Sequence, residues 1–207
     1  IITDGAFASY TGDYISGFSS GDIAYINRNG KMDYSISTIL SEINIVKSVA
    51  LSEYGSFALS ISGIRPEYIT LYDSKGKSLW YLDTTLNRRK HVSSYVSEKS
   101  MRAFMLADRD IIIYSLNNGK EINRINIEKY NMLNPVNMKL NAETNSTIMS
   151  VSKAGNSEVL IYDNKLEEVI FEKSIDAWVY YVDISKEYNE YMIVSDKMIY
   201  AYKRVKL

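Results

Sequence analysis

Short apolar runs separated by polar turns repeat along the whole chain. In the clearest case, apolar runs at 49–51 and 57–59 flank a polar turn that contains Gly55. Similar pairs of runs recur at four further places: at 138–151, at 182–194, and from Ala8 and Val92 onward. Because short apolar runs bounded by turn residues are typical of β-strands, each pair predicts two strands joined by a hairpin.

A third strand and a fourth strand follow each pair at a nearly constant distance. The third strands combine β-branched residues with a tyrosine, and we expect them at 23–26, 69–73, 111–114, 159–163 and 199–202. Asn-Gly or Lys-Gly turns follow at 29–31, 75–77 and 118–120. Such turns between apolar runs predict hairpins, which lead here to fourth strands at 32–36, 78–82, 121–125 and 168–171.

The copies begin near residues 6, 47, 92, 136 and 179, so the period is about 41–45 residues. Four short strands in that length are typical of one β-propeller blade. The sequence therefore predicts an all-β fold, a single propeller domain over 1–207 with repeats near 6–40, 47–84, 91–127, 136–173 and 179–207. An ordinary antiparallel sandwich is the alternative, since its turns have similar spacing. Apolar residues in the stretch 35–47 also allow a short helix there.

The number of blades is left open, because the fifth copy ends after its third strand. Residues 1–3 are a candidate for the missing strand, which would close a five-bladed ring; otherwise the chain is part of a seven- to eight-bladed one. An open sheet edge promotes aggregation, so we favour closure slightly. The chain begins with Ile1 and lacks a signal-like segment, from which we expect a processed product or a piece of a longer chain.

Segments 68–80 and 113–122 resemble the repeat of PQQ-like (quinoprotein-like) propellers, which runs strand, polar turn, Gly-Lys, strand, aromatic residue. The turn at 51–55 is similar to the first hairpin of WD40-like propellers, although the Gly-His and Trp-Asp dipeptides of that family are absent. Trp80 supplies the aromatic residue of a fourth strand, and the positions we match to it are Met32, Arg124 and Phe171, or residues near them. The resemblance implies a bacterial, extracytoplasmic scaffold, as in outer-membrane protein assembly.

Composition removes several classes of function. The chain has 207 residues, and its formal net charge of -1 offers no global attraction to nucleic acid or an anionic membrane. It has no cysteine, which excludes disulfides and thiolate metal sites, and its single histidine, His91, excludes a His-rich metal site. No long apolar run predicts a transmembrane segment. We expect no cofactor, because the quinoprotein dehydrogenases whose repeat this one resembles form a larger, eight-bladed ring with metal ligands that this sequence lacks.

Candidate catalytic residues are few. Asp73 and Asp163 follow a tyrosine at matching positions, and we interpret them as turn residues that accept backbone hydrogen bonds rather than as a catalytic pair. Two alternatives stay open: a five-bladed hydrolase of glycosides or lactones, with carboxylates around the axis, and a carbohydrate-binding propeller with aromatic pockets repeated in each blade.

The loops between second and third strands, and those between blades, gather at one end of a propeller. In this chain they carry the residues that we select as candidates for partner binding: Arg65, Arg88, Arg89, His91, Arg109, Tyr130 and Trp178. Arg, Tyr and Trp are enriched at interface hot spots, so the sequence predicts a non-catalytic platform for a protein or peptide partner. The alternative for Tyr130 and Trp178 is packing between blades. We expect an extracytoplasmic location (periplasm or cell surface), with the cytoplasm as the alternative.

Overall fold

A computed structural model describes residues 1–84, 92–107, 110–126, 134–141, 146–153, 156–163, 168–185 and 190–203. Within these residues, all regular structure is β-strand, and no helix of the length and apolarity needed to cross a membrane occurs. The strands form five antiparallel sheets, of which four have four strands and one has three. The prediction of an all-β chain built from four-stranded antiparallel repeats is therefore confirmed.

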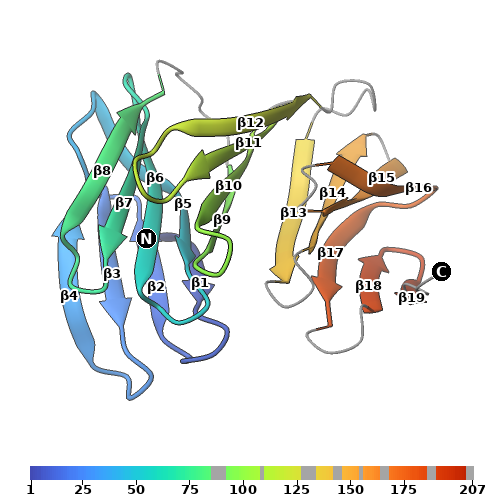
Figure 1. Cartoon of the computed structure of the whole chain (residues 1–207), viewed down its shortest axis with the longest axis horizontal. Helices are drawn as coiled ribbons and strands as arrows, with labels where there is room; N and C mark the ends of the chain where they lie inside the picture. The colour runs from blue at the N-terminus through green and yellow to red at the C-terminus, as the bar shows by residue number, and fades with distance from the viewer. Residues whose placement is uncertain are drawn as a thin grey trace. The chain divides into compact units, whose positions relative to one another are not determined.

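The strands of each sheet follow one another in the order of the sequence (Figure 1). The first sheet contains β1 (Ile2–Phe7), β2 (Tyr14–Phe18), β3 (Asp22–Ile26) and β4 (Met32–Ser37). The second contains β5 (Ile43–Leu51), β6 (Phe57–Ile64), β7 (Tyr68–Asp73) and β8 (Ser78–Asp83). The third contains β9 (Ser93–Ser97), β10 (Arg102–Ala107), β11 (Asp110–Ser115) and β12 (Glu121–Asn126). The fourth contains β13 (Asn134–Asn141), β14 (Ser146–Lys153), β15 (Asn156–Asp163) and β16 (Glu168–Ile175), and the fifth β17 (Val179–Ile184), β18 (Glu190–Ser195) and β19 (Ile199–Lys203).

Two expectations about the first sheet are wrong. The stretch 35–47 forms no helix: it ends β4, crosses as an irregular connection and begins β5, and Leu40, which a helix would bury, is 77% exposed. The second expectation was that residues 1–3 supply the missing strand of the fifth copy. Ile2 pairs with Phe18 of β2, and the Ile1 carbonyl accepts the Ser19 N–H at 2.9 Å, so the start of the chain already belongs to the first sheet.

The predicted turns between third and fourth strands form, and a side chain closes each of the first two. Gly30, Gly76 and Gly119 all have positive φ, at 75°, 79° and 70°. Oδ1 of Asp73 accepts the N–H groups of Lys75 and Lys77, both at 2.9 Å. This confirms Asp73 as a structural turn residue; the turn after Asp163 lies outside the described residues. Asn27 has the same role in the first sheet, where its Oδ1 accepts two N–H groups of its own turn.

Aromatic side chains of the fourth strands pack against turn glycines of the following sheet. A Cβ built on Gly76 would lie 2.9 Å from the ring of Tyr34, and one on Gly119 would lie 3.0 Å from the ring of Trp80. The indole Nε1–H of Trp80 also donates to the Leu116 carbonyl at 2.7 Å. Tyr34, and not the exposed Met32, therefore corresponds to Trp80, since the two aromatic residues pair with equivalent positions of their third strands.

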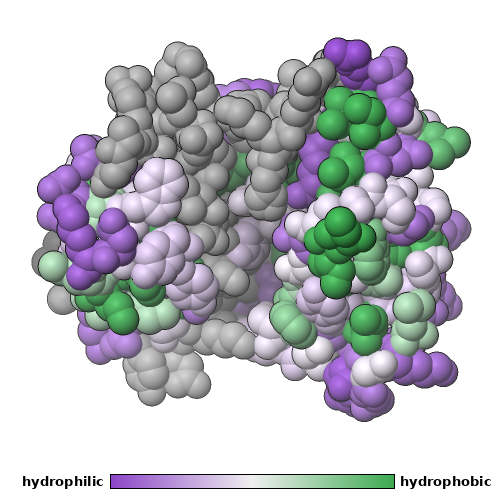
Figure 2. Space-filling view, turned by 180° about the vertical axis from the view of Figure 1, so that it is seen from behind, coloured by the Kyte–Doolittle hydropathy of each residue, from purple (hydrophilic) through white to green (hydrophobic). Residues whose placement is uncertain are grey.

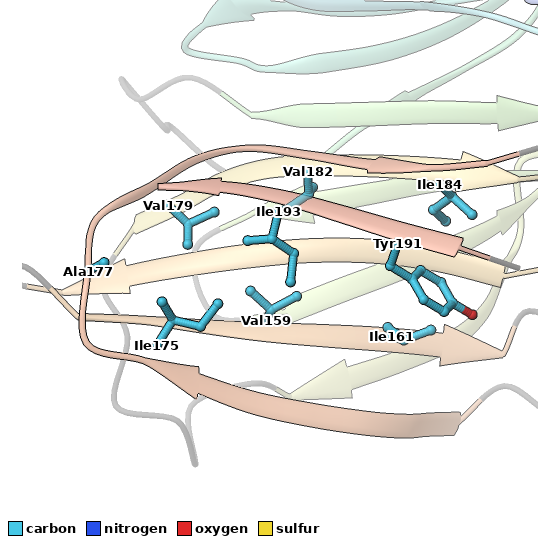
Figure 3. Packing of buried hydrophobic residues seen from close by; sticks show 9 residues of the cluster. All are labelled: Val159, Ile161, Ile175, Ala177, Val179, Val182, Ile184, Tyr191 and Ile193. Carbon is cyan, nitrogen blue, oxygen red and sulfur yellow. The ribbon is translucent and has the colours of Figure 1, made fainter. Parts of the chain in front are cut away.

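The chain divides into two compact units, which are described separately. The first contains Ile1–Phe104 and Ile113–Ile122, and the second contains Met105–Ile112 and Asn123–Leu207. In the first unit, buried side chains of the first two sheets form one cluster: Ala8, Ile15, Ile23, Tyr25, Val46, Val49, Leu51, Ala58 and Tyr72. In the second unit, the fourth and fifth sheets enclose what we call the aliphatic cluster (Figure 3): Val159, Ile161, Ile175, Ala177, Val179, Val182, Ile184, Tyr191 and Ile193.

Candidate functional site

Two of the seven predicted partner-binding residues lie in the part of the chain that the structure describes. Arg65 follows β6 in the first unit, and Trp178 precedes β17 in the second. The other five lie outside the described residues: Arg88, Arg89, His91, Arg109 and Tyr130. The candidate site is therefore built from the surroundings of Arg65, and Trp178 is described with its own neighbours.

Arg65 lies in one of two connections that are joined by hydrogen bonds, and we call these two connections the loop pair. They are residues 38–42, between β4 and β5, and residues 65–67, between β6 and β7. The Glu42 N–H donates to the Arg65 carbonyl at 3.1 Å. The Ser41 hydroxyl donates to the Pro66 carbonyl at 2.7 Å. Two bonds between the connections fix their spacing without using the Arg65 side chain.

The turn between β2 and β3, which contains Gly21, anchors the loop pair to the first sheet. The N–H and the hydroxyl of Thr38 both donate to the Gly21 carbonyl, at 2.9 and 2.7 Å. Gly21 has φ +87°, and a Cβ there would lie 2.8 Å from Cβ of Asn44. Asn44 in turn accepts the Ser41 N–H through Oδ1 at 2.8 Å. The connection 38–42 is thus held at both of its ends.

Glu67, the last residue of the loop pair, forms a buried ion pair with Lys47 of β5. Lys47 donates to Glu67, and the two side chains are only 4% and 0% exposed. The Thr84 hydroxyl donates to Oε1 of the same carboxylate at 3.0 Å, and the Thr84 N–H donates to the Glu67 carbonyl at 3.0 Å. Removing one partner of a buried pair costs about 3–5 kcal/mol, because the other charge stays buried. This network fixes the end of the 65–67 loop.

The loop pair presents an apolar and a charged group to solvent. Leu40 is 77% exposed, and Ile43, the first residue of β5, is 54% exposed. The Arg65 guanidinium lies 3.7 Å from the Glu42 carboxylate, and both side chains are more than half exposed. Because exposed ion pairs contribute little to stability, the two charges remain available to a partner at low cost. Arg65 also has φ 61°, a left-handed conformation that costs a non-glycine residue about 1–2 kcal/mol.

Sequence reasoning found Arg65 but missed Leu40 and Ile43. The spacing of the isoleucines and Leu40 between 36 and 45 matched a helix, and a helix would have turned Leu40 inward. The signal that identifies the connection correctly is its density of small polar residues. The Asn44 side chain accepts the Ser41 N–H, a local bond that competes with a helix, and the hydroxyls of Thr38 and Ser41 bond the distant carbonyls of Gly21 and Pro66.

Trp178 lies in a tight connection of the second unit. Its N–H donates to Oδ1 of Asp196 at 3.0 Å, and its carbonyl accepts the Asp196 N–H at 3.1 Å. Lys197 donates to the carbonyl of Asp176 in the same connection. The Trp178 side chain is 39% exposed and is not among the buried residues of the aliphatic cluster. The bonds fix the backbone while a large part of the indole stays in contact with solvent.

Carboxylates at the opposite end of the first unit are used in structural contacts. Oε2 of Glu53 accepts the Glu98 N–H at 2.7 Å, and Oε2 of Glu98 accepts the Ser52 hydroxyl at 3.0 Å. These bonds join the first hairpins of the second and third sheets. Among the described residues, no group of three or more His, Cys, Asp or Glu side chains is placed to hold a metal ion.

Asp13 is a further carboxylate at this end that makes structural hydrogen bonds. Partial burial acts to raise its pKa, but hydrogen bonds from Thr11 (2.6 Å), the Arg28 N–H (2.9 Å) and Tyr25 hold the pKa of Asp13 below its usual value. The pKa of Tyr25 is raised, first by burial and then by its bond to Asp13. A neutral phenol that donates to a carboxylate is a stable structural pair and not an acid or base poised near neutral pH.

Tyr10 and Tyr54 stack on each other in the first hairpins at this end. The rings of Tyr10 and Tyr54 are 4.9 Å apart with an interplanar angle of 18°, and both side chains are about half exposed, at 43% and 54%. They occupy the same position in the first hairpins of the first and second sheets, as the bonds from Ala8 to Asp13 and from Ser52 to Phe57 show. Lys99 occupies that position in the third sheet, so the aromatic residue is not repeated there.

No family model matches the sequence, and no curated protein matches it. The structure is similar to the β-propeller domain of Cps50 (Swd1) from Myceliophteria thermophila, with a TM-score of 0.71 and 14% sequence identity. The match covers 100% of this chain and 66% of that one, so the chain spans slightly less than two thirds of the domain's length. At this identity the likeness shows the fold, and the fold of the chain is that of a β-propeller.

Proposed function

We propose that the chain is a non-catalytic β-propeller platform that binds a protein or peptide partner, and that in the first unit the loop pair is the contact surface. The main support for this proposal is that the backbone of the loop pair is fixed by hydrogen bonds while its side chains are exposed. Hydrogen bonds from Thr38, Ser41 and Glu42 fix the loop pair, while Leu40 is 77% exposed.

A fixed loop pair favours binding because its order is established before a partner arrives. Association costs about 0.5–1.5 kcal/mol for each long side chain that must be ordered, and mobile loops add to that cost. Leu40 and Ile43 offer apolar area to bury, and Arg65 and Glu42 offer charges of both signs beside it. An apolar centre with a polar rim is the ordinary composition of a protein interface.

The distribution of apolar side chains on the surface supports a partner that binds reversibly to small patches. In Figure 2 the apolar side chains form separate patches among hydrophilic ones on the face that is shown. Large continuous apolar areas mark obligate interfaces, whereas small patches beside charges suit a reversible partner. The two alternatives have weaker support. Glu53 and Glu98 are engaged in structural bonds, and the Tyr10–Tyr54 stack is not repeated in the third sheet.

The setting that we propose is a bacterial extracytoplasmic scaffold or assembly factor. The support is the resemblance of segments 68–80 and 113–122 to cofactor-free PQQ-like propellers, together with the absence of cysteine, which is compatible with export. Fractionation of native cells with an antibody against the chain tests this setting, and recovery in the cytosolic fraction alone would contradict it.

The experiment for the platform places a photo-crosslinking residue at position 40 of the protein in its native host. We expect one dominant crosslinked partner, which the substitution Arg65→Asn weakens at least fivefold. Asn tolerates the left-handed backbone conformation of Arg65, so this change removes the guanidinium without new strain. The matched control carries the crosslinker at Lys31, an exposed residue in the turn before β4. Equal crosslinking from both positions would reject the loop pair as the contact surface.

A further inference from the structure

The stacked tyrosines Tyr10 and Tyr54 lie where two neighbouring hairpins of the first unit are joined. Tyr10 belongs to the hairpin between β1 and β2, and Tyr54 belongs to the hairpin between β5 and β6. The Tyr10 N–H donates to the carbonyl of Glu53, the residue before Tyr54, at 2.9 Å. The backbones that carry the two rings are therefore held beside each other.

Each of the two hairpins is also closed by its own backbone bonds. In the first, the Ala8 N–H donates to the Asp13 carbonyl at 2.9 Å. In the second, the Ser52 N–H donates to the Phe57 carbonyl, also at 2.9 Å. Both residues of the stack lie inside these closed turns, so their backbone positions are fixed once the first two sheets have formed.

The rings of Tyr10 and Tyr54 are in contact with each other. Their centroids are 4.9 Å apart, and their planes make an angle of 18°. Aromatic pairs in proteins have centroids about 4.5–7 Å apart, so this pair lies at the close end of that range. A small tilt is enough to bring ring carbons of the two residues to bonding distance, and the solvent side of the stack leaves room for that tilt.

Solvent reaches both rings of the stack. Tyr10 is 43% exposed and Tyr54 is 54% exposed. A one-electron oxidant in solution can therefore approach either phenol, and water beside the ring can accept the phenolic proton that is lost with the electron. A tyrosine of the core, such as Tyr72 with 4% of its surface exposed, offers neither of these conditions.

Another stacked pair of the first unit, Tyr25 and Tyr34, shows what exposure adds. The centroids of these two rings are 5.1 Å apart and the interplanar angle is 22°, which is nearly the geometry of the exposed pair. Tyr25 is only 5% exposed, and the hydroxyl of Tyr34 is buried. The ring of Tyr34 also lies against Gly76, so it cannot tilt without displacing that turn. The buried pair therefore has the stacking but neither the access nor the room to move.

We propose that Tyr10 and Tyr54 are a site of oxidative cross-linking, at which a haem peroxidase with hydrogen peroxide joins the two rings as dityrosine. Each phenol loses one electron to the oxidant and one proton to water, which gives two phenoxyl radicals. The radicals couple through one carbon ortho to each oxygen, so that a carbon–carbon bond forms. The hydrogen on each of these carbons then moves to the oxygen, and both phenols are restored. The two electrons and two protons that leave reduce one hydrogen peroxide to two molecules of water.

The cross-link acts as a covalent connection between the first and second sheets. It closes the segment 10–54 into a loop in the unfolded chain, and loop closure stabilises the folded state because it lowers the conformational entropy of the unfolded one, as in a disulfide. The sequence has no cysteine, so a disulfide cannot supply such a connection. The site uses no residue of the loop pair, and its test is independent of the role of the loop pair.

The test treats the 207-residue chain, diluted to limit links between molecules, with a haem peroxidase and hydrogen peroxide. We expect mass spectrometry of a digest of the monomer to identify a link between Tyr10 and Tyr54 that is two hydrogens lighter than the separate peptides. Tyr10→Phe keeps the stacked ring but has no phenol to oxidise, and it should lower the dityrosine fluorescence of the monomer at least fivefold. Tyr54→Phe should have the same effect.

Tyr81→Phe is the matched control for these two variants. Tyr81 is 60% exposed, but its ring meets that of Tyr68 edge-on at a centroid distance of 6.1 Å. This variant should keep the dityrosine fluorescence of the unchanged chain. Circular dichroism before the treatment shows whether each variant is folded.

Urea unfolding followed by circular dichroism gives a second readout. We expect the cross-linked monomer to unfold at a higher urea concentration than the untreated chain. The proposal is overturned if the link maps to other tyrosines, if links form only between molecules, or if the phenylalanine variants at positions 10 and 54 keep the fluorescence. It is also overturned if the cross-linked monomer unfolds at the same urea concentration as the untreated chain.

Discussion

The contact between the first and second sheets and the contact between the fourth and fifth are made in different ways. In the first contact, directional bonds join backbone and side chains across the two sheets. Oδ2 of Asp4 accepts the Val49 N–H at 2.9 Å, and the Tyr10 N–H donates to the Glu53 carbonyl at 2.9 Å. Gly55 also lies against the Tyr25–Asp13 pair. Such bonds fix the position of one sheet relative to the next.

The second contact relies on the aliphatic cluster (Figure 3). Its buried polar link is Ser157, whose hydroxyl donates to the Ala177 carbonyl and accepts the Val179 N–H, both at 2.9 Å. Apolar contacts are not directional, so this cluster should tolerate hydrophobic exchanges that conserve volume. The first contact should instead be sensitive to geometry, because a misplaced donor leaves a buried polar group without a partner.

The largest expected effect is loss of volume in the aliphatic cluster. Ile193 is 1% exposed, and Ile193→Ala should lower the free energy of unfolding of the second unit by about 2–5 kcal/mol through the cavity that it leaves. Urea unfolding followed by Trp178 fluorescence in a Trp80→Phe background reports on this unit. Met192→Ala is the control, because Met192 is 39% exposed and its truncation should cost much less. Equal costs would mean that the cluster is not the source of stability.

A smaller effect is expected from geometry at the first contact. Gly55 has φ +74°, and a Cβ there would lie 2.6 Å from the Tyr25 hydroxyl and 2.9 Å from Oδ2 of Asp13. Gly55→Ala should therefore destabilise the first unit by about 2–3 kcal/mol, through backbone strain and displacement of this pair. Trp80 fluorescence in a Trp178→Phe background measures it.

Gly30→Ala separates the effect of backbone strain from the effect of close packing. Gly30 has nearly the same φ, +75°, but a Cβ there would meet nothing within 4 Å. This variant should show the strain alone, about 1 kcal/mol. If the two alanine variants lose the same free energy, close packing at Gly55 contributes nothing to the first contact.

The smallest effect concerns pH. Because the folded-state pKa of Asp13 lies below its usual value of 3.8, the unfolded chain binds the proton first as pH falls. The contribution of Asp13 is thus complete above about pH 4 and is lost as pH falls through the folded-state pKa. Asp13→Asn should flatten the acid limb of a stability–pH curve, and Thr11→Val should move that limb toward higher pH. An unchanged limb in both variants would contradict the role of these bonds.

Features encoded within a few neighbouring residues could be predicted from the sequence. The third and fourth strands, the turns at Gly30, Gly76 and Gly119 and the role of Asp73 all depend on local spacing, and the structure has them where the pattern placed them. The β-propeller fold followed from the repetition of this pattern. Membership in the PQQ-like or WD40-like families, ring closure and the remaining candidate residues stay predictions.

Features that depend on neighbouring sheets could not be predicted in this way. Tyr34 was missed as the partner of Gly76 because the contact joins different copies of the repeat. The spacing of Leu40 from Ile36 allowed a short helix, but the hydrogen bonds of Thr38 and Ser41 to other turns hold an irregular connection. Of the candidate site, the sequence identified Arg65 through the chemistry of its residue type but not the apolar surface beside it.

The ion pair between Lys47 and Glu67 also constrains how this protein can change over evolutionary time. Neither side chain tolerates replacement while the other keeps its charge, so drift at the two positions has to be coupled. Homologous sequences should therefore carry both residues or neither, with two uncharged side chains as the other viable combination. Thr84, which bonds the same carboxylate, should vary together with them.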